Sequence, residues 1–224
     1  MRYFLVPTLV SFFLLLGLVA AKAEPTPGEI DRIEAATRVF NEIPGMIPAF
    51  VLHNAKGIAV IPGEVKAGFI FGGELGGGVL VSRLPNGSWS PPALISVAGG
   101  SFGLQIGGEV RDIVLVFNTN SSMANIENGR INLGGDVSVA VGPGGADVGM
   151  TTNVPQVYSY VRSAGAFIGA TVEGSVLSFD FNANRDLYGT SDPLRMEARG
   201  IPAPAQRFTC AVTRATGARS KVCG

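Results

Sequence analysis

Hydrophobic positions follow two different periods along this chain, and the change between them falls near Gly57. Before it, apolar residues recur at helical spacing over residues 24–43, where Thr26, Pro27 and Glu29 form the capping pattern of a helix start. After it, short apolar runs bounded by glycine, proline or polar residues have the length of β-strands. The expected strands cover residues 57–62, 67–72, 79–84, 93–98, 102–106 and 112–117.

The expected N-terminal helix has one apolar face, and later segments alternate with the period of two that is typical of antiparallel strands. The sequence Pro85-Asn86-Gly87 indicates a hairpin turn. These patterns predict an α+β fold with a mainly antiparallel, strongly curved sheet, a barrel or half-barrel, and the N-terminal helix packed on it. The apolar face consists of Ile30, Ile33, Ala36, Phe40 and Ile43.

The first residues have the pattern of a secretory signal peptide. Arg2 precedes a long apolar run, and Ala21-Lys22-Ala23 is a cleavage pattern without a cysteine that would carry a lipid anchor. We therefore expect a cleaved signal over residues 1–23 and a periplasmic or secreted protein that is not lipid-anchored. The expected remainder is a single domain over 24–199, helical over 24–55 and β-rich over 56–190, followed by a basic tail over 200–224.

Composition narrows the function classes. With 46% hydrophobic and 15% charged residues the chain is globular, and its formal charge of zero gives no long-range attraction to nucleic acid. Removing residues 1–23 leaves 15 basic and 17 acidic residues, a formal charge of −2. Cys210 and Cys223 are the only cysteines; we expect a disulfide after export, with two free thiols as the alternative. The tail carries the basic residues Arg207, Arg214, Arg219 and Lys221 and no acid.

Two motifs that suggest chemistry lack their required context. Residues 99–103 match G-x-S-x-G around Ser101, but a serine hydrolase needs a strand–turn–helix elbow and a later histidine. The single histidine, His53, comes earlier, and a strand pattern follows Ser101. Asp180 begins an oxygen-rich segment that lacks the glycine and glutamate of a calcium loop. We expect no catalysis, no metal and no cofactor.

A series of glycine-rich motifs between about residue 28 and residue 190 resembles the SYLF domain family. Each motif is weak alone, but their order and spacing together are specific. The residues that carry the resemblance are Lys56-Gly57, Gly76-Gly77-Gly78, Trp89-Ser90-Pro91, Asp112, Gly134, Asp136, Gly142, Tyr158, Tyr160 and Tyr188-Gly189.

The resemblance implies a non-catalytic module that binds lipid, phosphoinositides in eukaryotic members, through an amphipathic N-terminal helix. Yeast members are also described as actin-binding, but an exported chain would not meet actin, so we expect a lipid or membrane surface as the partner. The expected contacts are the apolar helix face and the basic tail residues, although that face also suits covering the sheet. The alternative functions are a β-barrel carrier of a small apolar ligand and, with least support, a serine hydrolase. The oligomeric state is left open.

Overall fold

A computed structural model of the chain describes residues 27–42, 45–68, 71–102, 107–126, 129–143, 155–163, 166–168 and 172–223. The expected signal peptide at 1–23, the helix cap at Thr26 and Ile43 of the apolar helix face lie outside these residues. So does most of the expected strand at 102–106, of which only Phe102 is described.

In the described residues two helices come first, and two runs of strands separated by a helix follow before the last helices. The helices are α1 (Pro27–Asn41), α2 (Ala49–Asn54), α3 (Asn120–Ile126), α4 (Phe181–Tyr188) and α5 (Ala203–Ala215), with a 3₁₀ turn η1 at Pro193–Arg195. The strands are β1 (Gly57–Gly68), β2 (Phe71–Ser82), β3 (Ala93–Phe102), β4 (Gly107–Phe117), β5 (Arg130–Asn132), β6 (Val139–Val141), β7 (Val157–Ser163), β8 (Ala166–Ile168) and β9 (Ser175–Phe179).

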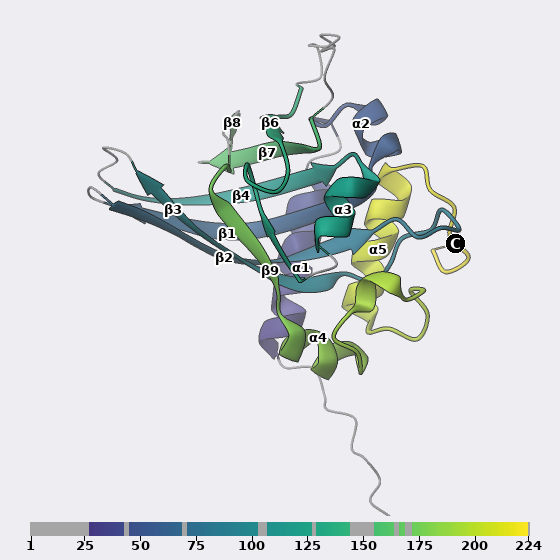
Figure 1. Ribbon diagram of the computed structural model, residues 1–224. Helices are drawn as coiled ribbons and strands as arrows, with labels where there is room; N and C mark the ends of the chain where they lie inside the picture. Colours follow the sequence, from purple (N-terminus) through teal and green to yellow (C-terminus); the bar gives the residue numbers. More distant parts are fainter. Residues whose placement is uncertain are drawn as a thin grey trace, which may run out of the picture.

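The described strands form one curved sheet in the order β5-β9-β3-β2-β1-β4-β7-β6, and β8 pairs with β7. Every pairing is antiparallel among these strands except β6 with β7, which is parallel. The sheet curls into a half-barrel, and the long strands β1 to β4 extend beyond the helices (Figure 1). The expected fold class, α+β with a mainly antiparallel curved sheet, is therefore confirmed.

Side chains on the two faces of the sheet build two separate cores, because successive strand residues point to opposite sides. On one face, α1 and α5 pack behind the sheet (Figure 1) and cover a core that includes Val60, Val79 and Val114. On the other face, the curled sheet and α3 enclose a second core that includes Leu80 and Ile113.

A small cavity lies among side chains of the second core. Its volume is about 10 Å³, which is at the lower limit for a single water molecule, and its lining includes Leu80, Ile95, Leu177 and Phe179. This cavity is too small for the apolar ligand of the carrier hypothesis.

Strands β1 and β2 are longer than the hydrophobic runs predicted. The pairing of β1 with β4 shifts register between Ile61 and Glu64, which marks a β-bulge at Pro62 and Gly63. Gly63 has a φ of 61°, a backbone conformation that glycine adopts without strain. The bulge allows one strand to continue through a proline that the sequence pattern indicated as its end.

The C-terminal region differs from the expected tail. Residues 203–215 form α5, whose Phe208, Ala211 and Val212 are buried in the helical core. The basic residues of this segment lie on the outer side of an amphipathic helix, and the hydrophobic residues between them pack inward. Burial of these apolar side chains favours the packing of α5 on the rest of the protein, so the segment is part of the folded domain.

Candidate functional site

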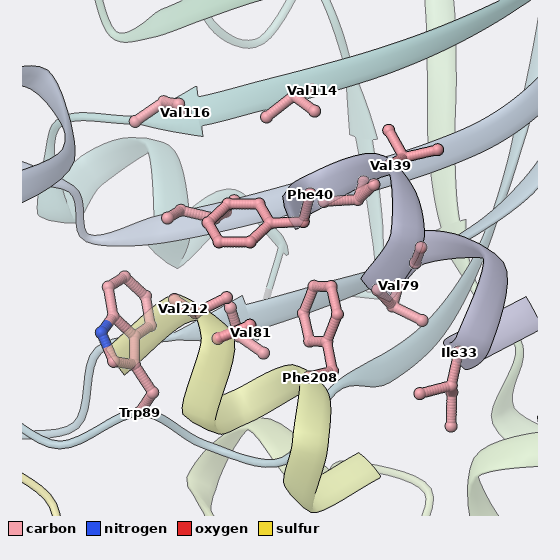
Figure 2. Close-up of a cluster of buried hydrophobic side chains, with 14 of the residues drawn as sticks. Ile33, Val39, Phe40, Val79, Val81, Trp89, Val114, Val116, Phe208 and Val212 are labelled. Carbon is pink, nitrogen blue, oxygen red and sulfur yellow. The ribbon is translucent and has the colours of Figure 1, made fainter. Parts of the chain in front are cut away.

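The apolar face of α1 is buried inside the protein. Ile33 and Ala36 are fully buried, and Phe40 is 2% exposed. Figure 2 shows Ile33, Val39 and Phe40 of α1 facing valines of the sheet and Phe208 of α5; the ring centroids of Phe40 and Phe208 are 5.9 Å apart. Ile30 packs against the same core and is partly buried. This face covers the sheet, so it is not available to a bilayer in this structure.

The four basic residues of the C-terminal segment do not form one patch. Arg207 donates to Glu34 of α1 at 2.8 Å, which ties the two helices together at their surface. Arg214 is exposed near the end of α5. Arg219 and Lys221 lie farther along, on the wall of a cavity described below. A helix spreads residues 207 and 214 along one side, whereas the following loop turns residues 219 and 221 elsewhere.

The Trp89-Ser90-Pro91 motif attaches α5 to the sheet. The indole Nε1 of Trp89 donates to Thr216 Oγ1 at 2.8 Å, and the guanidinium of Arg83 lies 4.7 Å from the centroid of the indole ring. Ser90 Oγ accepts from the backbone nitrogen of Ser82 at 3.0 Å, while the Ser90 carbonyl accepts from Thr209 of α5 at 3.2 Å. Every polar atom of this contact has a structural partner, so the motif stabilises the fold.

The tyrosine motifs are also structural. Tyr188 donates its hydroxyl hydrogen to the carbonyl of Pro92 at 2.7 Å, and its burial raises its pKa, with a smaller contribution from Glu29. Burial likewise raises the pKa of Tyr160, to which the neighbouring Tyr158 adds. A neutral phenol is favoured in both places because ionisation would leave a charge in a poorly hydrated site.

Most of the motif glycines allow close approach or a left-handed turn. A Cβ on Gly142 would meet the ring of Tyr160. A Cβ on Gly57 would meet the side chain of Met123, and a Cβ on Gly78 would meet the carbonyl of Val60. Gly134 and Gly189 have φ values of 89° and 74°, and Gly189 ends α4 as its C-cap. Asp136 accepts from the backbone nitrogen of Asn132 at 2.8 Å. Lys56, Gly76 and Gly77 are half-buried, Gly76 beside Ile61 and Glu64, and Gly77 beside Arg32.

Asp112 is a motif residue that lines an open surface groove, as does Gly77. This groove of about 690 Å³ runs between α1 and the strands β1, β2, β4 and β7. The side chain of Asp112 accepts from Gly63 N and from Arg162 Nε, each at 2.9 Å, and Arg162 also forms an ion pair with Glu42 at the end of α1. This network fixes the floor of the groove to its helical wall.

The groove carries both signs of charge. Its acidic residues are Asp31, Glu42 and Asp112, and its basic residues are Arg32, Arg38 and Arg162. Arg32 lies 3.4 Å from Asp180, so it is already partly neutralised. Asp31 and Arg38 are exposed on the outer side of α1, and within the described part of the chain neither has an ion pair.

An apolar surface lies beside this groove. Leu75 is 69% exposed and Val110 is 63% exposed, and both pair with Val65 across the sheet. Leu75 is two residues from Gly77 in β2, and Val110 is two residues from Asp112 in β4, so strand alternation places both on the face that holds the groove. The sequence could not indicate this site, because it combines α1 with strands that the β-bulge extends.

Two other sequence motifs suggested catalysis or metal binding. Ser101 lies within β3, which pairs with β2 as far as Phe102, so the strand–turn–helix elbow is not formed at this serine. In the described ranges no group of three or more His, Cys, Asp and Glu side chains is placed to hold a metal. A search of the same residues for a membrane-spanning helix finds none of sufficient length and hydrophobicity.

Comparisons with known proteins identify the family. Residues 98–207 match the family model Ysc84, described as Las17-binding protein actin regulator. Protein YSC84 of Saccharomyces cerevisiae is 41% identical over 161 residues, which are 69% of this chain and 34% of that protein. The SH3 domain-containing YSC84-like protein 1 of Homo sapiens is 39% identical over 148 residues, 64% of this chain and 43% of that protein. The chain thus matches less than half of the length of these relatives.

The names of these relatives correct the expected partner. LAS seventeen-binding protein 3 of Saccharomyces cerevisiae is 40% identical over 168 residues, 71% of this chain and 36% of that protein. The name of this relative refers to binding of a protein, and the family description adds regulation of actin. The expectation of a lipid or membrane surface as the partner, with actin set aside, was therefore wrong. The match over residues 98–207 and the identity of about 40% show that this chain belongs to the Ysc84 family, the SYLF family that the sequence motifs resemble.

Proposed function

We propose that this chain is a non-catalytic protein-binding module and that the groove between α1 and the sheet receives its protein partner. The observation that carries the proposal is the pair of exposed charges, Asp31 and Arg38, on the rim of a groove whose floor is fixed by Asp112. The protein-binding names of the relatives support the class of partner.

The shape and charge of the groove suit a protein surface. Its wall is a helix held by a packed core, and its floor is held by the Asp112–Arg162 contact, so little order has to be gained on binding. Charges of both signs set the register of a partner and reject surfaces with the wrong pattern. Leu75 and Val110 beside the groove would supply apolar contact area. Actin is the first partner to test, because the family description names it.

The experiment exchanges the two rim charges. Asp31→Arg combined with Arg38→Asp leaves the net charge unchanged but reverses the pattern along α1. We expect co-sedimentation with actin filaments to weaken at least about tenfold, since two charge contacts would become repulsive. The matched control exchanges two exposed charges on α4, with Arg185→Asp and Asp186→Arg.

Each outcome bears on the proposal. Loss of binding in the α1 exchange with normal binding in the α4 exchange supports the groove. Equal binding by both variants would place the contact elsewhere on the molecule. A wild-type chain that binds vesicles of anionic phospholipid, but not actin filaments, would overturn the protein-binding proposal.

We also propose that the chain acts outside the cytosol. The signal pattern at residues 1–23 and the disulfide between Cys210 and Cys223 support this compartment, because disulfides persist where thiols are not kept reduced. Mass spectrometry of the protein recovered from its natural source is the test. A mature chain that begins at Glu24 is expected, and a chain that retains residues 1–23 would contradict the proposal. Actin filaments serve in the groove test as a purified probe of protein binding, and a chain outside the cytosol would meet a different protein there, so the two proposals are tested separately.

A further inference from the structure

A second cavity, of about 350 Å³, opens at the other end of the helical layer from the long strands. Its walls come from the hairpin around Asn86, the segment after η1, and the C-terminal loop that follows α5. Figure 1 shows this loop near the C label, away from the extended ends of β1 to β4. The cavity is therefore separate from the groove beside α1.

The polar lining of this cavity has an excess of positive charge. Arg199, Arg219 and Lys221 line it together with a single acid, Glu197. The carboxylate of Glu197 is already occupied: Oε2 lies 3.0 Å from Arg199 Nε, and Oε1 accepts from Asn86 Nδ2 at 3.3 Å. In the described residues Arg219 and Lys221 have no acidic partner, so they contribute two uncompensated charges to one concave surface.

The wall that carries these two cations is held in place. The disulfide between Cys210 and Cys223 closes the loop onto α5. Within the loop, Ala218 N donates to the carbonyl of Thr213 at 3.1 Å, and the carbonyl of Val222 accepts from Gln206 Nε2 at 3.3 Å. A loop whose backbone is fixed before the ligand arrives loses less conformational entropy on binding.

We propose that this cavity binds a small organic anion through its carboxylate or phosphate groups. The planar guanidinium of Arg219 can donate two parallel hydrogen bonds to such a group, and the ammonium of Lys221 adds a point charge. Ser220 Oγ accepts from Val222 N at 3.1 Å, and its hydroxyl hydrogen is a further donor. Ala198 and Val222 supply apolar contacts for the carbon body of the ligand, and the cavity volume lies within the range of small-molecule sites.

Isothermal titration calorimetry at constant ionic strength tests the proposal, with citrate as the carboxylate probe and inorganic phosphate as the phosphate probe. We expect saturable one-site binding of at least one probe, and whichever binds identifies the oxyanion. Arg219→Ala with Lys221→Ala should weaken it at least about tenfold, because both charge-assisted contacts are lost. The matched control, Arg130→Ala with Arg185→Ala, removes the same charge from exposed positions outside the cavity lining and should bind normally.

Three results would overturn the inference or part of it. Absence of saturable binding by both probes would remove the site. An equal loss of affinity in the two double variants would show that net charge, and not this cavity, attracts the anion. Cys223→Ser should also weaken binding several-fold, because the loop is released from α5; unchanged affinity would refute the positioning role of the disulfide. None of these results depends on binding of actin, so the outcome is distinct from the test of the groove.

Discussion

The contact between Phe40 of α1 and Phe208 of α5 allows a quantitative test of how the two helices pack together. Both rings are buried, at 2% and 0% exposure, with their planes tilted by 57° (Figure 2). Replacing Phe208 by alanine should lower the free energy of unfolding by about 4 kcal/mol, since the site loses buried apolar area and gains a cavity. Because domains are marginally stable, the pair is better dissected with leucine at each position.

The leucine series is a double-mutant cycle. Phe40→Leu and Phe208→Leu should each cost about 1.5 kcal/mol, and the double variant should cost about 1 kcal/mol less than their sum, because the tilted aromatic pair is lost only once. Urea unfolding followed by fluorescence is the assay, and Trp89, the single tryptophan and a member of the same core, is the probe.

An exposed phenylalanine provides the control for this cycle. Phe50 of α2 is 44% exposed, and Phe50→Ala should change the free energy of unfolding by less than about 0.5 kcal/mol. Additive costs at Phe40 and Phe208 would show that the rings do not interact. A small effect of Phe208→Ala, below about 1 kcal/mol, would refute the packing of α5 on α1.

Three further changes have expected outcomes. Gly142→Ala should cost about 1–3 kcal/mol in chemical denaturation, because the new methyl group would meet the ring of Tyr160, whereas Gly28→Ala, which meets open space, should cost nothing. The free energy of unfolding should be constant below about pH 10 and fall as the pH rises above it. Burial raises the pKa of Tyr188 in the folded protein, so only the unfolded chain ionises near the ordinary tyrosine pKa. Tyr188→Phe should reduce that fall, and an unchanged fall would contradict the role of Tyr188. Cys223→Ser should lower the free energy of unfolding by about 3 kcal/mol, and an unchanged thermal midpoint would contradict it.

The spacing of hydrophobic residues predicted the fold class because it indicates which face of each helix or strand is buried. The helical spacing of Ile33, Ala36 and Phe40 indicates a face that must be buried, and α1 buries it. What covers this face is a different question. The sequence pattern is the same for a helix on a membrane and a helix on a sheet, so only the structure could show Phe208 opposite Phe40.

The groove and the basic cavity could not be predicted from the sequence pattern. The basic residues after residue 200 were read as one tail, but α5 directs Arg207 to Glu34 while Arg219 and Lys221 line a cavity with Arg199. The groove beside α1 has no sequence signature, because Asp31 and Arg38 have the spacing of charged residues on any surface helix. Asp112 belongs to the family motifs and lies on the floor of the groove, but no sequence pattern connects it with the helical wall.

By itself the sequence determined the family and the fold class, because both depend on local spacing: the order of the motifs and the period of the hydrophobic positions. The helical spacing of Ile33, Ala36 and Phe40 is an example that neighbouring residues are enough to indicate. Only the tertiary structure decided that α1 and α5 share one core, that the bulge at Gly63 extends the strands, and which charges meet at the groove and the cavity. Those outcomes depend on contacts between residues far apart in the chain, which no local pattern encodes.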